Sequence, residues 1–228
     1  MAERPEPAAL WARLRTWADR WQLPPPQISP GWINLPPSFK PLAKPGSMIE
    51  RPLFEPPATD QDADRLEHHI GLPLPQDLRE LYAVHDGSYA PLLPYGMSLL
   101  GYEAITTTWN MFAELADQFQ SEPVLADDGT HYDGVYHRAW LPVAASDDMH
   151  MVLDLIPGPA GAYGHALMLV NECDFVLVGR SLRDFLDRWL TALDQGRAVF
   201  DADYGYAVPV PDEADYIDFL RLDSTLPA

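Results

Sequence analysis

Residues 139–170 read AWLPVAASDDMHMVLDLIPGPAGAYGHALMLV, and from here the hydrophobic pattern of the chain changes from a helical period to a period near two. A period of two is typical of β-strands, because successive side chains on a strand point to opposite faces of the sheet. The pattern predicts strands at 140–145, 149–156 and 165–170, and a fourth at 175–178. Turn-forming residues separate these segments, so we expect an antiparallel meander.

Apolar residues with helical spacing predict helices before and after the strands. The first carries a continuous apolar stripe and ends before the prolines that begin at Pro24. Two short helices are expected after Thr59 and Pro75, a longer one at about 102–120, and a last one after Ser181. The stripes consist of Leu10, Leu14, Trp17 and Trp21 in the first helix, Ala63, Leu66 and Ile70 in the second, Leu78, Leu81 and Tyr82 in the third, Ile105, Trp109, Phe112, Ala116 and Phe119 in the fourth, and Leu182, Phe185, Leu186, Trp189, Leu190 and Leu193 in the last.

The composition divides the chain into three parts. Residues 1–58 are expected to form an N-terminal helix and a Pro-rich arm that packs on the domain, because apolar side chains recur among the prolines. Residues 59–195 hold the regular helices and strands and form the predicted domain. Residues 196–228 are an acidic C-terminal extension, with one strand and one short helix expected in it.

Charge is the strongest signal in the composition. The chain has 15 basic and 34 acidic residues and a net charge of −19. Residues 1–51 hold 7 basic and 4 acidic residues (+3), so residues 52–228 hold 8 and 30 (−22). A protein surface with this negative charge repels nucleic acid and anionic lipid and speeds association with a basic partner. A merely soluble acidic surface would have the same composition.

Two further compositional features bear on compartment and on chemistry. No apolar run approaches the roughly 18 residues that a membrane-spanning helix needs, so we expect a cytoplasmic protein with no membrane contact. Cys173 is the only cysteine, which excludes an internal disulfide and a multi-cysteine zinc site. The common signatures of metalloproteases, serine hydrolases and P-loop nucleotide-binding proteins are absent. We therefore expect neither catalysis nor a cofactor.

The acids, histidines and glycines of residues 146–165 are the strongest candidates for a metal or catalytic site. His150 and Asp154 share one face of a predicted strand but lie about 13 Å apart, at roughly 3.3 Å per residue, so one metal ion cannot bridge them. His165 could approach either residue from the next strand, which makes a pair but not a full ligand set. Glycines 158, 161 and 164 fall between two strands with no helix after them, so the wide loop they form lacks the helix N-terminus of a phosphate site. An enzyme that uses His150 or His165 with Asp154 stays open as an alternative.

Four motifs in order resemble the SUKH superfamily, the family of the yeast cell-wall assembly regulator and its bacterial immunity-protein relatives. They are IGLPLPQDLRELYAVHDGSYAP (70–91), GMSLLGYEAITTTWNMF (96–112), AWLPVAASDDMHMVLDLIPGPAGAYGHAL (139–167) and VLVGRSLRDFLDRWL (176–190). The resemblance covers about residues 59–195. It implies an α+β fold in which helices pack on one side of a mostly antiparallel sheet, and a binding role without catalysis.

The resemblance and the charge lead to one principal functional hypothesis and one alternative. The principal hypothesis is a bacterial immunity protein that binds and neutralises a basic, nuclease-type toxin domain and makes no direct contact with nucleic acid. The alternative is an adaptor or regulator of the cell-wall assembly or signalling type, whose Pro-rich arm docks a partner. The candidate contacts with a partner are Asp127, Asp128, Tyr132, Asp133, Tyr136, Asp147 and Asp148. A chance clustering of loop residues would explain these candidates equally well.

Overall fold

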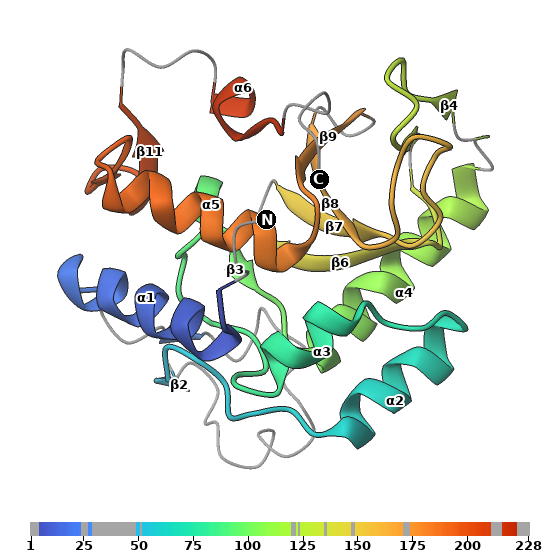
Figure 1. Ribbon diagram of the computed structural model, residues 1–228. Coiled ribbons are helices and arrows are strands. Elements are labelled where there is room, and N and C mark those ends of the chain that lie inside the picture. Colours follow the sequence, from blue (N-terminus) through green and yellow to red (C-terminus); the bar gives the residue numbers. More distant parts are fainter. Residues whose placement is uncertain are drawn as a thin grey trace.

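A five-stranded antiparallel sheet lies at the centre of the fold, with the strand order β3-β6-β7-β8-β9 (Figure 1). From β6 onward the spatial order follows the chain, so the predicted meander is confirmed. The computed structural model describes residues 5–23, 27–28, 49–50, 52–119, 122, 124–134, 136–146, 149–170, 174–210 and 216–222. The strands are β3 (Ser98–Leu99), β6 (Trp140–Ala145), β7 (His150–Asp154), β8 (His165–Val170) and β9 (Asp174–Gly179).

Most residues of the apolar stripes of the helices belong to a core on one face of this sheet. Met151 and Leu153 point into that core from β7 and are fully buried. The helices and the antiparallel sheet together form the α+β fold that the sequence predicts. The helices are α1 (Pro7–Arg20), α2 (Asp60–Ile70), α3 (Gln76–Tyr82), α4 (Tyr102–Phe119), α5 (Leu182–Asp194) and α6 (Tyr216–Leu220), with a 3₁₀ turn η1 (Pro94–Gly96).

Two helices begin at the caps that the sequence predicts. At α2 the Asp62 amide donates to the Thr59 hydroxyl, and the Thr59 amide donates to the Asp62 carboxylate. At α5 the Asp184 amide donates to the Ser181 hydroxyl at 3.2 Å. Such caps satisfy amides that have no partner within the helix, and each is worth about 1 kcal/mol.

Helix α1 is held against α3 and α5, and Figure 1 shows it running beside α5. The Trp11 indole donates to the Leu81 carbonyl oxygen at 2.9 Å. Arg13 forms ion pairs with Asp187 at 2.6 Å and Asp194 at 2.7 Å, both on α5. Each of the two ion pairs joins residues more than 170 positions apart in the sequence. The domain limits drawn at 58/59 and 195/196 stay predictions.

Most of the Pro-rich arm lies outside the described residues. Its described parts include β1 (Gln27–Ile28) and β2 (Ile49–Glu50), which pair with each other in antiparallel orientation, and residues 52–58, from which Phe54 is buried in the core. In the C-terminal extension, β10 (Ala198–Asp201) and β11 (Tyr206–Pro209) form a hairpin, where one strand had been predicted. None of the helices in the described part of the chain has the length and apolar character that crossing a bilayer requires.

The second face of the sheet is also buried, which the sequence did not predict. Val152 and Leu167 point to this side and are fully buried. Phe112 from α4 and Leu222 from the C-terminal segment pack on the same cluster. Another hairpin, formed by β4 (Val124–Leu125) and β5 (Tyr132–Asp133), makes contacts with the edge strand β9. This hairpin holds most of the predicted partner-binding residues.

Candidate protein-binding site

The β4–β5 hairpin is built around a turn that Asp128 stabilises. The Asp128 carboxylate accepts hydrogen bonds from the Thr130 amide at 2.9 Å and the Thr130 hydroxyl at 2.7 Å. Burial opposes ionisation of Asp128, but these hydrogen bonds outweigh burial and lower its pKa. Asp128 is exposed, as a contact residue must be, and it already stabilises its own turn.

His131 and Asp133 fasten the hairpin to the edge strand β9. The buried His131 ring lies with Nε2 2.9 Å from the Phe175 carbonyl oxygen, to which this nitrogen must donate because a carbonyl only accepts. The Phe175 amide in turn donates to the Asp133 carboxylate at 2.9 Å. Asp133 therefore has a structural role, and its half-buried carboxylate is only partly available to a partner.

The glycines of the loop that follows β7 allow it to pack directly on the hairpin. The Gly158 amide donates to the Thr130 carbonyl oxygen at 3.1 Å, and the Ala160 amide to the Gly129 carbonyl oxygen at 2.9 Å. A Cβ atom added to Gly158 would lie 2.4 Å from the Gly129 oxygen, closer than side chains tolerate. The glycine run is thus explained by the approach of two backbones, in keeping with the wide loop expected from the sequence.

The suspected catalytic residues are distributed over the sheet as strand geometry predicts. His150 lies opposite Ala145, whereas Asp154 lies opposite His165, so the pair left open in the sequence is adjacent in the sheet. Asp154 is completely buried and its Oδ1 accepts from the Ile156 amide at 2.9 Å, while Oδ2 has no hydrogen-bond partner among the described residues. Burial raises the pKa of Asp154 and lowers the pKa of His165. Both shifts favour the uncharged forms.

Asp154 and His165 are not part of a metal-binding group in the described part of the chain. His165 accepts a long hydrogen bond of 3.3 Å from the Ala162 amide. No group of three or more His, Cys, Asp or Glu side chains among the described residues is placed to hold a metal ion.

Exposed apolar side chains surround the hairpin and form the surface that sequence reasoning missed. Val124 is 68% exposed, Leu125 42% and Ile156 50%. The Leu125 side chain reaches the loop at Gly158, so β4 and the loop that begins at Ile156 form one continuous surface. Phe119, at the end of α4, is also exposed although it continues the apolar stripe of that helix. We call Val124, Leu125, Ile156 and the acid Asp127 the hairpin surface.

The predicted contact residues differ in how far they fit this surface. Asp127 is exposed on the turn of the hairpin, and Tyr132 is half-buried beside it. Tyr136 packs on Phe112 with ring centroids 4.8 Å apart, so it belongs more to the second core than to a contact surface. Asp147 and Asp148 lie outside the described residues, as does Cys173. An apolar pair directly before an acidic turn was the signal that could have pointed to Val124 and Leu125.

Comparison with known proteins yields one family and two curated relatives. Residues 57–188 match the model of the SMI1 / KNR4 family (SUKH-1). The chain is 28% identical over 190 residues to a cell wall biosynthesis/cell cycle regulator smi1 of Schizosaccharomyces pombe, a match covering 72% of this chain and 37% of that protein. It is 26% identical over 186 residues to a glucan synthesis regulatory protein of Neurospora crassa, covering 64% and 35%. The matches span just over a third of the length of these relatives.

Proposed function

Because the chain belongs to the SMI1/KNR4 family (SUKH-1), we propose that it is a non-catalytic protein-binding domain acting as a regulator of cell-wall or glucan synthesis. The observation that carries this proposal is that both fungal relatives are named as regulators of such synthesis. It takes up the adaptor or regulator alternative from the sequence. A binding role also agrees with the complete burial of Asp154, which keeps that carboxyl group away from solvent.

The hairpin surface is the region through which we propose that a partner is bound. Its apolar side chains are large and exposed, and such side chains supply the central contacts of protein interfaces. Asp127 beside them adds a negative charge at the rim, which favours a partner with basic residues around an apolar anchor. The hydrogen bonds of Asp128, His131 and Asp133 hold the hairpin in one conformation, so little ordering is needed on binding.

A substitution matched for exposure tests the surface in cells. Val124→Asp places a charge at the most exposed apolar position of the hairpin surface, and Tyr204→Asp places one at a 65% exposed position in the β10–β11 turn. In the source organism, deletion of the gene should change glucan content and sensitivity to wall-digesting glucanase. Wild-type protein and Tyr204→Asp should restore both properties, whereas Val124→Asp should not, at equal protein levels. Full restoration by Val124→Asp would exclude the hairpin surface, and an unchanged wall after deletion would exclude the regulatory role.

The charge of residues 52–228, −22, favours a second candidate function, the immunity protein expected from the sequence. A strongly acidic binding protein is complementary to a basic, nucleic-acid-binding toxin domain and would be steered to it electrostatically. Co-expression with a basic toxin domain encoded beside the gene should then rescue growth. The two purified proteins should also form a complex whose association slows steeply with salt. No rescue and no complex would leave the regulator as the remaining proposal.

A further inference from the structure

The Thr130 hydroxyl group, in the turn of the β4–β5 hairpin, makes two short contacts but carries only one proton. Its Oγ1 lies 2.7 Å from the Asp128 carboxylate and 2.8 Å from Nδ1 of His131. A hydroxyl group has one proton to donate, so it cannot donate to both partners. Asp128 does not supply a second proton: burial opposes its ionisation, but the hydrogen bonds from Thr130 outweigh burial and lower its pKa. The second proton must therefore come from His131.

The other ring nitrogen of His131 already uses one proton. Nε2 lies 2.9 Å from the Phe175 carbonyl oxygen, which only accepts. A neutral imidazole has a single N–H group, so with that proton on Nε2 its Nδ1 can only accept. The Thr130 hydroxyl would then donate to Nδ1, and the Asp128 carboxylate would face the hydroxyl oxygen without a proton between them. Only the doubly protonated, positively charged ring satisfies all three contacts at once.

Charged groups from several elements act on the His131 ring. The Asp133 carboxylate lies 3.4 Å from Nε2 and favours the positive charge of the ring. Burial opposes that charge, since His131 is only 4% exposed. The charge of the ring is therefore set by a balance between burial and neighbouring carboxylates, and pH can shift this balance. The described titratable or charged groups around the ring are Asp128 in the turn, Asp133 on β5, Asp154 on β7 and His165 on β8, with Arg221 acting on Asp128.

Loss of the second ring proton would break a contact that holds the turn. The Thr130 hydroxyl would have to leave either Asp128 or Nδ1 of His131, and the turn would rearrange. Histidine changes charge between about pH 5 and 8. We propose that His131 is a pH switch that holds the hairpin surface in one conformation when protonated and releases the turn as the pH rises. The consequence for partner binding rests on the proposed function of the hairpin surface.

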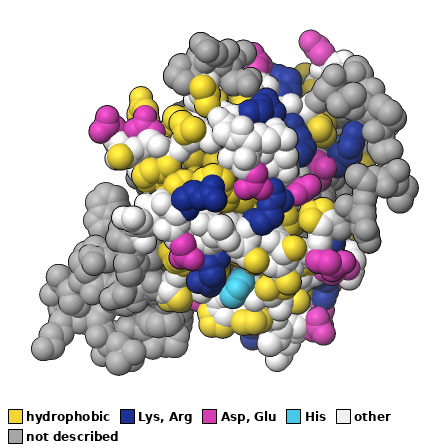
Figure 2. Space-filling view, turned by 60° about the vertical axis from the view of Figure 1, so that its left-hand side comes forward, with side chains coloured by type: hydrophobic (Ala, Val, Ile, Leu, Met, Phe, Trp, Pro, Cys, Tyr) yellow, Lys and Arg dark blue, Asp and Glu magenta, His cyan; other side chains and the backbone are white. Residues whose placement is uncertain are grey.

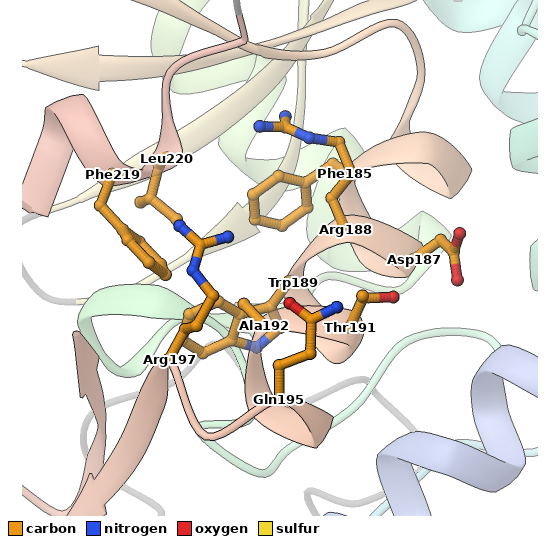
Figure 3. Close-up of a pocket in the computed structure, with 10 residues that line it drawn as sticks. All are labelled: Phe185, Asp187, Arg188, Trp189, Thr191, Ala192, Gln195, Arg197, Phe219 and Leu220. Carbon is orange, nitrogen blue, oxygen red and sulfur yellow. The ribbon is translucent and has the colours of Figure 1, made fainter. Parts of the chain in front are cut away.

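The other cations in the described part of the chain do not give this response. Apart from histidine, all of them are arginines, which stay charged throughout this pH range. Figure 2 shows such side chains in dark blue on the face that includes α1 and α5, and Figure 3 shows the arginines of the pocket between α5 and α6. Burial lowers the pKa of His137, His150 and His165, so these rings favour the neutral form.

NMR of the full chain measures both the ring proton and the turn. Ring ¹⁵N shifts distinguish the doubly protonated form of His131 from either neutral tautomer, and we expect two N–H groups at about pH 5.5 and one, on Nε2, at about pH 8. The Ala126 and Gly129 amides donate to backbone carbonyl oxygens within the turn. Their protection from hydrogen exchange, corrected for the intrinsic effect of pH, should fall about tenfold over this range, because one charge-assisted hydrogen bond is lost.

Three variants make the test specific. Thr130→Val removes the hydroxyl group that links the ring to Asp128, so the turn should be weakly protected at both pH values. His131→Gln keeps a donor for the Phe175 carbonyl oxygen but cannot change its charge, so the protection of the turn should no longer depend on pH. His68→Gln replaces an exposed histidine on α2 and should behave like the wild type.

The proposal is overturned if His131 keeps one protonation state from about pH 5 to 8, or if the protection of the turn does not follow the titration of the ring. Retention of the pH dependence in His131→Gln would also overturn it. These measurements need no partner. Failure of the switch would therefore leave the proposed binding role in place, and restoration of the cell wall by Val124→Asp would leave the switch in place.

Discussion

Gly161 and Thr130 lie so close together that a Cβ atom added to Gly161 would be 1.9 Å from the Thr130 carbonyl oxygen. The two residues belong to different loops, the one after β7 and the turn of the β4–β5 hairpin. Neither loop can keep its position if the other moves, because their backbones are in direct contact and share hydrogen bonds. The hairpin surface thus depends on a residue that has no side chain.

We predict that Gly161→Ala destabilises the protein and disturbs the hairpin. The added methyl group must push the Thr130 backbone away, at a cost of roughly 2–4 kcal/mol in the free energy of unfolding. Gly196→Ala is the control, because a Cβ there has no heavy atom within 4 Å and only the positive φ of 70° opposes it, at about 1 kcal/mol. Urea unfolding measures both effects, and amide NMR shifts at 124–134 locate the disturbance. Equal losses in the two variants would contradict the tight loop contact.

Asp86 makes stability depend on pH in the weakly acidic range. Burial raises its pKa from 3.8 to about 6, although its Oδ1 accepts a hydrogen bond from the Tyr102 amide at the start of α4. Because the pKa is higher in the folded state, the contribution of Asp86 is most favourable below about pH 4 and is lost as the pH rises through 6. Each pKa unit corresponds to about 1.4 kcal/mol.

Asp86→Asn keeps the acceptor for Tyr102 and removes the charge, so we predict a gain in stability at pH 8 and none at pH 4. Thermal unfolding at both pH values measures the change, and carboxyl NMR titration of the wild type measures the pKa directly. A loss of stability that is equal at pH 8 and pH 4 would mean that ionisation of Asp86 does not affect stability, and a larger loss at pH 8 would mean that the ionised carboxylate is favoured in the fold.

Local patterns predicted the elements that depend on neighbouring residues. The strand predicted at 149–156 implies that Met151 and Val152 lie on opposite faces of the sheet, as the structure shows, because a strand has a fixed period of two. The caps at Thr59 and Ser181 also act within four residues of sequence. Burial of the second face depends instead on distant segments, such as Leu222, whose amide donates to the Leu177 carbonyl oxygen. No local period encodes such a contact.

At the candidate site, too, the sequence predicted features that depend on neighbouring residues and missed features that depend on tertiary contacts. The acids of the 124–134 hairpin were recognised as loop residues, and Asp127 is exposed as expected. The structural tasks of Asp128 and Asp133 were missed, because an acid in a turn looks the same whether or not it holds that turn. Val124 was missed for a related reason: an apolar residue in a sequence indicates burial, and exposure becomes visible only when the tertiary structure leaves it uncovered.

Arg13 should contribute more to stability than an ordinary surface arginine. It joins α1 to two aspartates on α5, Asp187 and Asp194, and it also donates to the Thr191 hydroxyl. We predict that Arg13→Ala lowers the free energy of unfolding by about 1–2 kcal/mol and reduces the protection of α1 from hydrogen exchange. Arg65→Ala removes an exposed ion pair within α2 and should cost less than about 0.5 kcal/mol. Similar losses in the two variants would show that the bridge between α1 and α5 adds nothing.

The buried carboxyl group of Asp154 should limit stability at neutral pH. Its raised pKa follows from burial, and Oδ2 has no hydrogen-bond partner among the described residues to stabilise the charge. The contribution of Asp154 is therefore most favourable below the unfolded pKa and is lost as the pH rises through the folded value. Asp154→Asn keeps the acceptor for the Ile156 amide, so we predict a higher unfolding temperature at pH 7 and a smaller change at pH 4. Asp127→Asn, on the exposed hairpin turn, should change neither value. If Asp154→Asn is destabilised equally at both pH values, the carboxyl group has a structural role that charge does not explain.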